Sequence, residues 1–480
     1  VNFMPISNHC ARRRAPLCPL IKCYVSSAFI CRKINYVNKN YMKSINYRLW
    51  FALILTSLMP LIYSTVRVYF LGSIPNTWTF SIAAQVTWLN VGYEVLSEAL
   101  LVPLSYILGK VLSDDEEFNY RTWQSLKIIV SSYFVVTAFV IWFTPELVLA
   151  MQQQYELIDI TVKYIRLESL AIFISAVYAY FTLIIIVKNE NTVMYKLLLT
   201  QMILMVVFDS LLVSQLPFSL ALGIIGVAIS NVVVNLVLAV MITVYISKSC
   251  ISNGTSNKKT YKRAWLNEWA RIGLKSGLES FVRNIAFIVM ILQLINEVKQ
   301  AGTYWLANQF IWGWLLLPVL ALGKLVTQDA AINNGISSSR VNSYFCVTAV
   351  IVLAWVVTFP MWESFIHNVM GVKDSKAIMN LVLLLVAFYV IFSMNNVIDS
   401  YFYGVGRTDL MLYQSLMVNG LFYGVAYLFY QRGIFVPSVE TISLMFGFGI
   451  TVDAIITWCL YYMHRNNQNA VSINALSECK

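Results

Sequence analysis

Two carboxylates, Asp209 and Asp399, lie inside long apolar stretches of this sequence with no basic residue within one helical turn. An ionisable group in a hydrocarbon environment is costly, so it usually faces a cavity or a partner. A desolvated carboxylate can exchange protons or, when ionised, hold Na⁺. Two amides, Asn395 and Asn396, precede Asp399 and offer oxygen ligands to such an ion. These residues predict a site that binds and releases a coupling cation.

Further charged residues in apolar stretches have partners within reach. Glu94 and Glu98 are one helical turn apart and share one face of a helix, and Arg67 lies in the preceding stretch. One interpretation is a buried salt bridge from Arg67 to either glutamate that serves only folding, and the other is a role in ion coupling or substrate binding. Glu168 and Asp453 are weaker candidates for coupling.

A third group repeats every four residues along one stretch, as Arg271, Lys275, Glu279 and Arg283. Side chains four apart meet on a helix surface, so Glu279 is either neutralised by its own helix or joins Asp399 as a ligand of Na⁺. Arg271 and Lys275 lie near the start of the stretch and can extend to the membrane surface.

No enzyme motif accompanies these residues. Gly323-Lys324 lacks the upstream glycine and the Ser/Thr of a nucleotide-binding P-loop, and the HExxH and GxSxG patterns do not occur. The three histidines, His9, His367 and His464, lie in tails or loops. We therefore expect a protein that is not an enzyme, with no cofactor beyond a coupling ion, Na⁺ or H⁺.

The elements that carry these residues follow from composition. Of 480 residues 59% are hydrophobic and only 12% charged, and the mean hydropathy is +0.68. Soluble domains are about 45–50% apolar and about 25% charged, whereas a helix that crosses a bilayer needs about 20 apolar residues. The pattern predicts an all-α membrane protein with twelve spans, at 49–72, 78–112, 124–147, 158–187, 192–216, 218–247, 268–296, 302–333, 342–366, 376–404, 410–430 and 435–463.

The spans divide into two similar halves. A proline among Leu and Val residues, followed by Leu-Gly-Lys, occurs at 101–110 (LVPLSYILGK) and again at 317–324 (LPVLALGK), and Tyr180-Phe181 in the fourth span is matched by Tyr401-Phe402 in the tenth. Duplicated halves place a substrate site between them near the membrane midplane. We expect two pseudo-symmetric six-helix lobes, at 45–247 and 265–463, a basic linker at 248–264, and a cytoplasmic tail at 464–480.

Basic residues are distributed unevenly. Loops after the even-numbered spans are richer in Lys and Arg, which predicts that both termini are cytoplasmic. Nine bases and no acid occur up to Arg48, and Met42 directly precedes the first span. We expect 1–44 to be a basic extension, with 1–41 arising from a misplaced start, or alternatively a transit peptide. The net charge of +11 therefore indicates no nucleic-acid partner.

Four segments together resemble the multidrug and toxic compound extrusion (MATE) transporters. They are 60–72, which begins with proline and ends with glycine; Asp209 with 222–228 (LGIIGVA); 277–284 (GLESFVRN); and 403–408 (YGVGRT). Their order and spacing are similar to those of the family over about residues 45–463. The resemblance extends to the superfamily that also contains flippases for lipid-linked saccharides.

The resemblance implies a monomeric antiporter in the cell membrane that exports small organic cations in exchange for Na⁺ or H⁺ by alternating access. It matches Glu279 and Asp399 to functional acidic positions of the second lobe. Many members have an aspartate where this chain has Arg67, so the second lobe is favoured as the ion site.

Two other interpretations of the function of this sequence stay open. Arg67, Lys275 and Arg283 would suit a basic cavity and a flippase for an anionic lipid-linked saccharide, unless acidic residues pair with them. A membrane-embedded enzyme or receptor is disfavoured by the duplicated halves and the missing catalytic motif. Aromatic residues that either line a cation-binding cavity or pack between helices are Tyr63, Trp88, Trp305, Trp312, Trp314 and Tyr389.

Overall fold

The computed structural model describes residues 45–75, 78–188, 190–249, 264–332 and 335–478. The predicted extension at 1–44 and nearly all of the predicted linker at 248–264 lie outside the described residues. The transmembrane part belongs to one compact unit, Asn46–Lys480.

The described residues form helices and no strands. Those of the first lobe are α2 (Tyr47–Ser73), α3 (Thr79–Ala84), α4 (Val86–Gly109), α5 (Asp115–Ala150), η1 (Tyr155–Leu157), α6 (Ile158–Val187), α7 (Asn191–Leu212) and α8 (Gly223–Ser249). Those of the second lobe are α9 (Ala264–Ala286), η2 (Phe287–Leu292), α10 (Gln293–Glu297), α11 (Ala301–Asn308), η3 (Gln309–Leu315), α12 (Leu317–Ile332), α13 (Ser338–Thr358), η4 (Phe359–Met361), α14 (Trp362–Asn368), α15 (Ser375–Gly404), α16 (Thr408–Met417), η5 (Val418–Tyr423), α17 (Gly424–Gln431) and α18 (Val439–Glu478).

These helices confirm the predicted all-α membrane fold. Within the described ranges, ten helices are long and apolar enough to cross a membrane, and an eleventh span results if α11–η3 and α12, which meet at a bend of 55°, are counted together. The eleventh predicted span, 410–430, is helical from Thr408 to Gln431, but it consists of three pieces, α16, η5 and α17. Each piece is shorter than the roughly 20 residues that one straight crossing needs.

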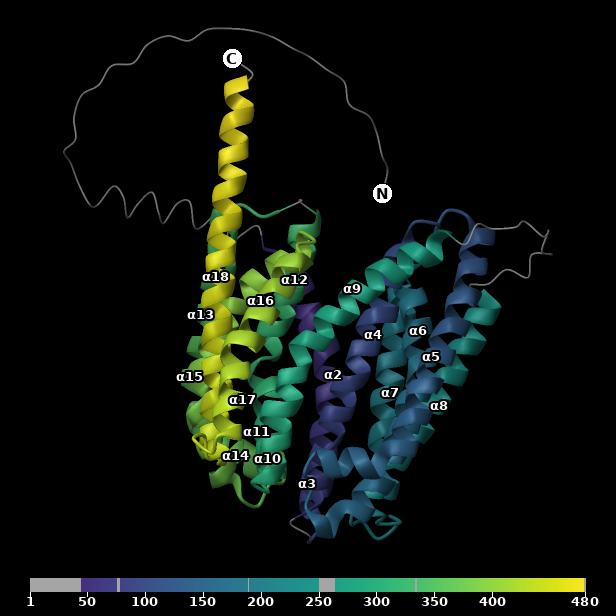
Figure 1. Ribbon diagram of the computed structural model, residues 1–480. Coiled ribbons are helices and arrows are strands. Elements are labelled where there is room, and N and C mark those ends of the chain that lie inside the picture. Colours follow the sequence, from purple (N-terminus) through teal and green to yellow (C-terminus); the bar gives the residue numbers. More distant parts are fainter. Residues whose placement is uncertain (1–44, 76–77, 189, 250–263, 333–334, 479–480) are drawn as a thin grey trace. The chain divides into compact units, whose positions relative to one another are not determined.

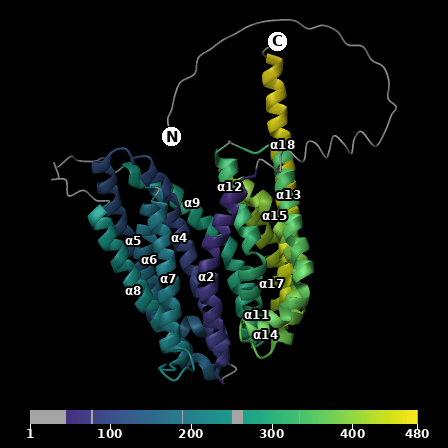
Figure 2. The ribbon, with the colours of Figure 1, turned by 180° about the vertical axis from the view of Figure 1, so that it is seen from behind.

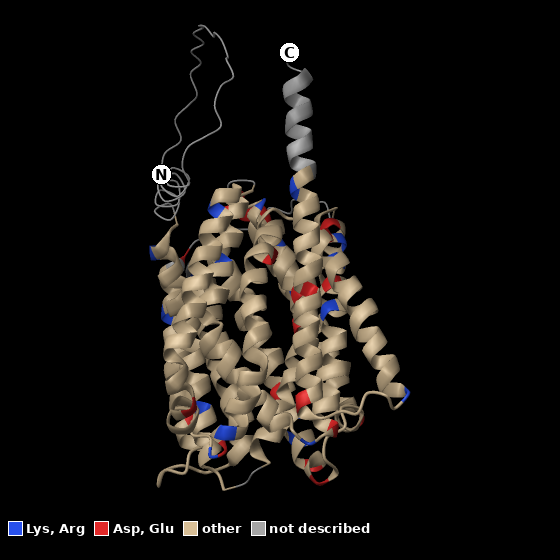
Figure 3. Ribbon diagram, turned by 90° about the vertical axis from the view of Figure 1, so that its left-hand side faces the viewer, with Lys and Arg blue, Asp and Glu red and all other residues tan. Residues whose placement is uncertain are grey.

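The helices gather into two bundles, one from the first half of the chain and one from the second (Figures 1 and 2). Charged residues lie mainly toward the two ends of the helices, and few lie between (Figure 3). This distribution fits a bilayer, because the middle of each helix would lie in hydrocarbon.

The first helix of each lobe reaches across to the other lobe. In α2, the indole N–H of Trp50 donates to the backbone carbonyl of Pro318 in α12 over 3.1 Å. In α9, Trp269 donates in the same way to the carbonyl of Leu100 in α4 over 3.0 Å. The two bonds are matched between the halves, since each connects the first helix of one lobe to the proline-containing segment of the other lobe.

The aromatic pairs that repeat in the sequence also take similar places in the structure. Tyr180 and Phe181 are buried in the first lobe with ring centroids 5.3 Å apart, and Tyr401 and Phe402 are buried in the second with centroids 5.8 Å apart. The hydroxyl of Tyr180 donates to the carbonyl of Thr122 in α5 over 2.6 Å, and the ring of Tyr401 packs against Tyr461 in α18 with centroids 5.6 Å apart. Both pairs are therefore buried within their own lobe, although each packs against a different neighbouring helix.

Two glycines allow α9 to lie directly against α4. A Cβ built on Gly273 would be 2.2 Å from the carbonyl oxygen of Ala99, and one on Gly277 would be 2.7 Å from the Cβ of Ala99. Small residues at this crossing let the two backbones approach closely, as is common between membrane helices. The contact fixes the position of α9 and therefore of the charged residues that repeat along it, Arg271, Lys275, Glu279 and Arg283.

We predict that Gly273→Ala destabilises the folded protein by about 1–3 kcal/mol, because the added methyl overpacks the α9–α4 contact. The measurement is unfolding of the purified protein in detergent. Gly92→Ala is the matched control, since no atom lies within 4 Å of a Cβ at Gly92. That variant should be unchanged or more stable by up to about 1 kcal/mol through helix propensity. Equal stability of the two variants would contradict the close contact.

Candidate functional site

A cavity of about 1710 Å³ lies between α4 of the first lobe and the helices of the second lobe. Small-molecule pockets are usually about 300–1,000 Å³, so this one can admit a bulky compound. Its charged lining within the described residues consists of six acidic and four basic side chains: Glu94, Glu98, Glu279, Asp399, Asp409, Asp453, Arg271, Lys275, Arg283 and Lys324.

One end of the cavity is closed by a pair of amides, one from each lobe. Gln85 and Asn296 are buried and exchange hydrogen bonds of 2.7 and 3.2 Å, and Asn296 also donates to the carbonyl of Met151 over 2.7 Å. Close by in the fold, a Cβ on Gly72 would lie 2.3 Å from the carbonyl oxygen of Gly371. The two lobes therefore touch at this end through backbone and buried amides.

The other end is open and basic. Arg271 and Lys275 from the first half of α9, and Lys324 from α12, line the cavity there and are exposed. Asp409 also lies at this end and accepts two hydrogen bonds of 2.9 Å from Arg407. The Arg407 guanidinium lowers the pKa of Asp409, so this carboxylate stays ionised and offsets part of the positive charge.

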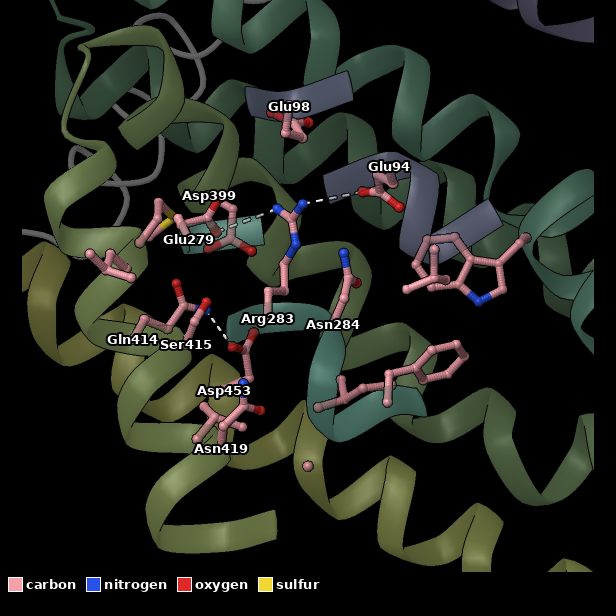
Figure 4. A pocket seen from close by; sticks show the side chains of 18 of the residues that line it. Glu94, Glu98, Glu279, Arg283, Asn284, Asp399, Gln414, Ser415, Asn419 and Asp453 are labelled. Carbon is pink, nitrogen blue, oxygen red and sulfur yellow. Dashed lines mark hydrogen bonds and ion pairs between the residues drawn. The ribbon is translucent and has the colours of Figure 1, made fainter. Parts of the chain in front are cut away.

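Arg283 connects acidic residues of both lobes inside the cavity (Figure 4). It donates to Glu94 on α4 over 3.2 Å, lies 3.5 Å from Glu279 on its own helix, and donates to the hydroxyl of Tyr403 over 3.2 Å. Glu98 lines the same wall and accepts a 3.4 Å hydrogen bond from Ser276. The arginine thus divides one positive charge between two carboxylates.

Arg67 does not pair with Glu94 or Glu98, which is where the salt-bridge interpretation of the sequence placed it. Its guanidinium instead donates hydrogen bonds of 2.8 and 3.1 Å to the two carboxylate oxygens of Asp209, which is 0% exposed. Neither of these two residues lines the cavity. The prediction that Asp209 is a lone carboxylate was therefore wrong in this structure, because α7 packs beside α2 and supplies the missing partner from a distant part of the sequence.

Asp399 belongs to a different kind of cluster. Nδ2 of Asn395 donates to Asp399 over 3.0 Å and also to Asp453 over 3.2 Å. The other oxygen of Asp399 accepts a hydrogen bond of 3.3 Å from Thr457 on α18. The other oxygen of Asp453 accepts a hydrogen bond from Gln414 on α16 (Figure 4). Both aspartates line the cavity. Two carboxylates are thus held together by neutral donors from three helices.

The remaining predicted residues are distributed around this cluster. Asn396 lines the cavity and donates to the carbonyl of Val319 over 3.3 Å. Glu279 lines it too and is buried, at 8% exposure. Lys275 faces the cavity without an ion pair to any described residue. The structure therefore brings the predicted ion-site residues into one cavity, with the exceptions of Asp209 and of Asn395, which lies behind the lining and bonds to Asp399.

The predicted aromatic residues separate into two sets. Trp88, Trp305 and Trp312 line the cavity. Tyr389 supports this wall from behind, since its hydroxyl accepts a hydrogen bond of 2.9 Å from Trp312. Tyr63 and Trp314 are absent from the lining, and Trp314 donates to Thr65 over 3.2 Å. Three of the six aromatic residues thus line the cavity, and the other three lie outside its lining.

Three π-helical segments supply cavity residues that the sequence did not single out. They are η2, η3 and η5, all in the second lobe, and they contribute Phe287, Gln309, Asn419 and Tyr423 among others. A π-helical turn inserts an extra residue and is frequent at functional sites. Its backbone pattern leaves no trace in hydropathy, so only unusual polar residues such as Asn419 in an apolar stretch could have marked it.

Comparison with known proteins gives matches at the level of structure. No protein-family model matches the chain, and no curated protein does. A multidrug resistance MATE family transporter of the MOP superfamily in an inward-facing conformation is similar with a TM-score of 0.70 and 15% identity, covering 88% of this chain and 99% of that one. The outward-facing form of such a transporter matches with a TM-score of 0.63 and 17% identity, over 90% and 97% of the two chains.

A MOP superfamily transporter from Pyrococcus furiosus is also similar, with a TM-score of 0.65 and 17% identity over 88% of this chain and 97% of that one. Its binding pocket is described as having reversed polarity, with a different function inferred for it. The chain therefore has the fold of the MATE transporters of the MOP superfamily. The resemblance of the sequence to this fold is confirmed.

We predict that Arg67→Met destabilises the protein by about 3–5 kcal/mol, because it leaves Asp209 as a buried charge without a partner. The double variant Arg67→Met/Asp209→Leu should recover most of this loss, since the uncompensated charge is gone. The measurement is denaturant unfolding of the purified variants in detergent. A double variant whose loss equals the sum of the two single losses would show that the pair is not coupled.

Proposed function

We propose that this protein is a secondary active antiporter that exports organic cations across the cell membrane in exchange for Na⁺ or H⁺ by alternating access. The polarity of the cavity carries the proposal. Below the basic mouth the lining contains five carboxylates, Glu94, Glu98, Glu279, Asp399 and Asp453, against one base, Arg283. A negative interior attracts cations and repels anions.

Aromatic side chains support the same substrate class. The three tryptophans of the lining, Trp88, Trp305 and Trp312, are joined there by Tyr304 and Tyr423. The face of an aromatic ring attracts a flat or quaternary cation, most strongly where water is excluded.

Closure at one end and opening at the other fits one state of an alternating-access cycle. The buried amides Gln85 and Asn296 close the end where α10 ends, and the exposed bases mark the end where α9 begins. With both termini in the cytoplasm, as the distribution of basic residues predicts, the cavity opens inward. The higher structural similarity to the inward-facing transporter agrees with this assignment.

An anionic substrate, as for a flippase of lipid-linked saccharides, is the second candidate. The observation in its favour is the exposed base cluster at the mouth, Arg271, Lys275 and Lys324, which could hold a lipid phosphate. The interior weakens this reading, because Arg67 is neutralised by Asp209 and Arg283 is shared between Glu94 and Glu279.

We predict that cells overproducing the protein tolerate more ethidium than cells without it, and that Asp399→Asn abolishes this gain because the coupling carboxylate is lost. Growth across an ethidium series and efflux from loaded inverted vesicles are the measurements, with Na⁺ and pH gradients imposed separately. Glu363→Gln is the control, because Glu363 is an exposed acid outside the cavity and should leave efflux unchanged.

We also predict that substrate charge separates the two candidates. The purified protein should bind ethidium, and Glu98→Lys should weaken that binding at least tenfold, or about 1.4 kcal/mol, by adding a positive charge to the interior wall. Fluorescence titration measures the affinity. Binding of a fluorescent anionic lipid that depends on Lys275 and Lys324, together with no ethidium binding, would favour the flippase.

A further inference from the structure

The end of α5 in the first lobe is bound by two side chains of α10 in the second lobe. Gln293 donates to the carbonyl of Ala150 over 3.0 Å, and Asn296 donates to the carbonyl of Met151 over 2.7 Å. Ala150 is the last residue of α5, and Met151 is its C-cap. The last four carbonyls of a helix have no partner along that helix, so they need donors from elsewhere. Here the donors come from the opposite lobe.

Asn296 also connects α10 to the beginning of α4. It exchanges hydrogen bonds of 2.7 and 3.2 Å with Gln85, and both side chains are buried. Gln85 is held by its own lobe, because it donates to the carbonyl of Ser81 over 3.2 Å and accepts from Trp88 over 3.2 Å. Gln293 and Asn296 are three residues apart and therefore project from one face of α10. One short helix of the second lobe thus binds two separate parts of the first.

All of these groups are neutral, which limits how strongly they hold this end closed. The donors are side-chain amides, and the acceptors are a side-chain amide or backbone carbonyls. Each bond favours the closed end by only about two- to tenfold, since water forms equivalent bonds with the same groups once they separate. An end closed in this way can separate at low cost, as one state of a two-state equilibrium must.

Around these bonds the two lobes lie in direct contact, at the end of the bundles where Figure 1 labels α3 and α10. A Cβ on Gly302 in α11 would be 3.0 Å from the Cβ of Phe80 and 3.1 Å from the backbone nitrogen of Ser81 in α3. Ser81 is 7% exposed and does not line the cavity, and its hydroxyl forms no hydrogen bond with any described residue. The side chain of Ser81 is therefore buried where the lobes meet.

α10 is also connected to the cavity through its own chain. It follows η2 directly, and η2 follows α9, on which Glu279 and Arg283 line the cavity. Asn419 in η5 donates to the carbonyl of Val282 on the same helix. A π-helical turn such as η2 contains an extra residue and is frequent at functional sites. A displacement of α9 in the cavity thus has a continuous helical route to the amides of α10.

We propose that Gln85, Gln293 and Asn296 form an amide latch that sets the balance between the two states of the alternating-access cycle. While the latch is formed, the lobes stay together at this end and the cavity opens only at its basic end. To open the latched end, the three amides and the two carbonyls of α5 exchange their bonds for bonds to water. The inference rests on the alternating access of the proposed function and is independent of the substrate and the coupling ion.

The test measures how often the latched end opens in the full-length protein, reconstituted in lipid nanodiscs with no substrate present. The reporter is Ser81→Cys in a background whose eight native cysteines are replaced by serine. Ser→Cys is nearly isosteric, and the rate at which a water-soluble maleimide modifies the buried thiol follows the open fraction, however small. Tyr155→Cys in the same background is the reference, since Tyr155 is 87% exposed. Thermal unfolding confirms that each variant is folded.

Asn296→Leu should raise the rate at Ser81→Cys at least fivefold, because the Met151 carbonyl then lacks its partner only while the end is closed. Gln293→Leu should raise it about twofold, since Gln293 is half-buried and water can replace part of its bond. Asn368→Leu is the matched control and should leave the rate unchanged, because Asn368 is an exposed amide that donates to Ser364 of its own helix.

Three results would overturn the inference. They are a rate at Ser81→Cys that Asn296→Leu and Gln293→Leu leave unchanged, an equal rise in Asn368→Leu, and a wild type in which Ser81→Cys reacts as fast as Tyr155→Cys. Gln293→Leu decides alone if Asn296→Leu does not fold. Rates that rise as expected in a protein unable to move ethidium would contradict the proposed export function and leave the latch standing.

Discussion

A charge placed among membrane helices must be neutralised, and the arrangement of this protein follows from how each of its buried carboxylates meets that requirement. The cost of a bare charge at the centre of a bilayer is at least about 2.5–3.5 kcal/mol. Asp209 meets it with Arg67, and Glu279 meets it in part with Arg283. Asp399 and Asp453 meet only neutral donors. This difference is the reason why we place the coupling ion of the proposed antiporter in the second lobe.

The same requirement gives the two lobes different roles despite their similar helices. The first lobe has a permanent internal cation, so its polar cluster can stay unchanged while the cavity opens and closes. In the second lobe, helices α15, α16 and α18 supply the acidic cluster, and three π-helical segments lie along the cavity wall. Irregular turns in membrane helices are tolerated where they line a cavity, and they can rearrange at lower cost than a regular helix.

In the proposed function, substrate and coupling ion would meet at the cavity wall. Arg283 contacts Glu94 of the first lobe, Glu279 and Tyr403, and Asp399 lines the same space. In the antiporter that we propose, a cationic substrate bound among these carboxylates would compete with the coupling ion for negative charge. Such competition is a sufficient basis for exchange, since binding of one cation lowers the affinity for the other.

The membrane spans and the charged residues within them were predictable from sequence alone. A membrane helix satisfies its backbone hydrogen bonds internally, so a local run of apolar residues is enough to identify it. The fourth predicted span, 158–187, coincides with α6, and every acidic residue of the cavity lining except Asp409 was identified as a carboxylate in an apolar stretch. The bend of 55° between α11–η3 and α12, and the π-helical turns, were not visible, since both depend on neighbouring helices.

Which charged and polar side chains of different helices pair with one another was determined only by the tertiary structure. Arg67 and Asp209 are 142 positions apart, and Asn395 and Asp453 are 58 apart. Sequence spacing reveals partners along one helix, as for Glu279 and Arg283, but it carries no information on which faces of distant helices meet. Whether a buried carboxylate is held by a fixed arginine or left for a mobile cation depends on those faces, and so the charge balance of each lobe is a property of helix packing.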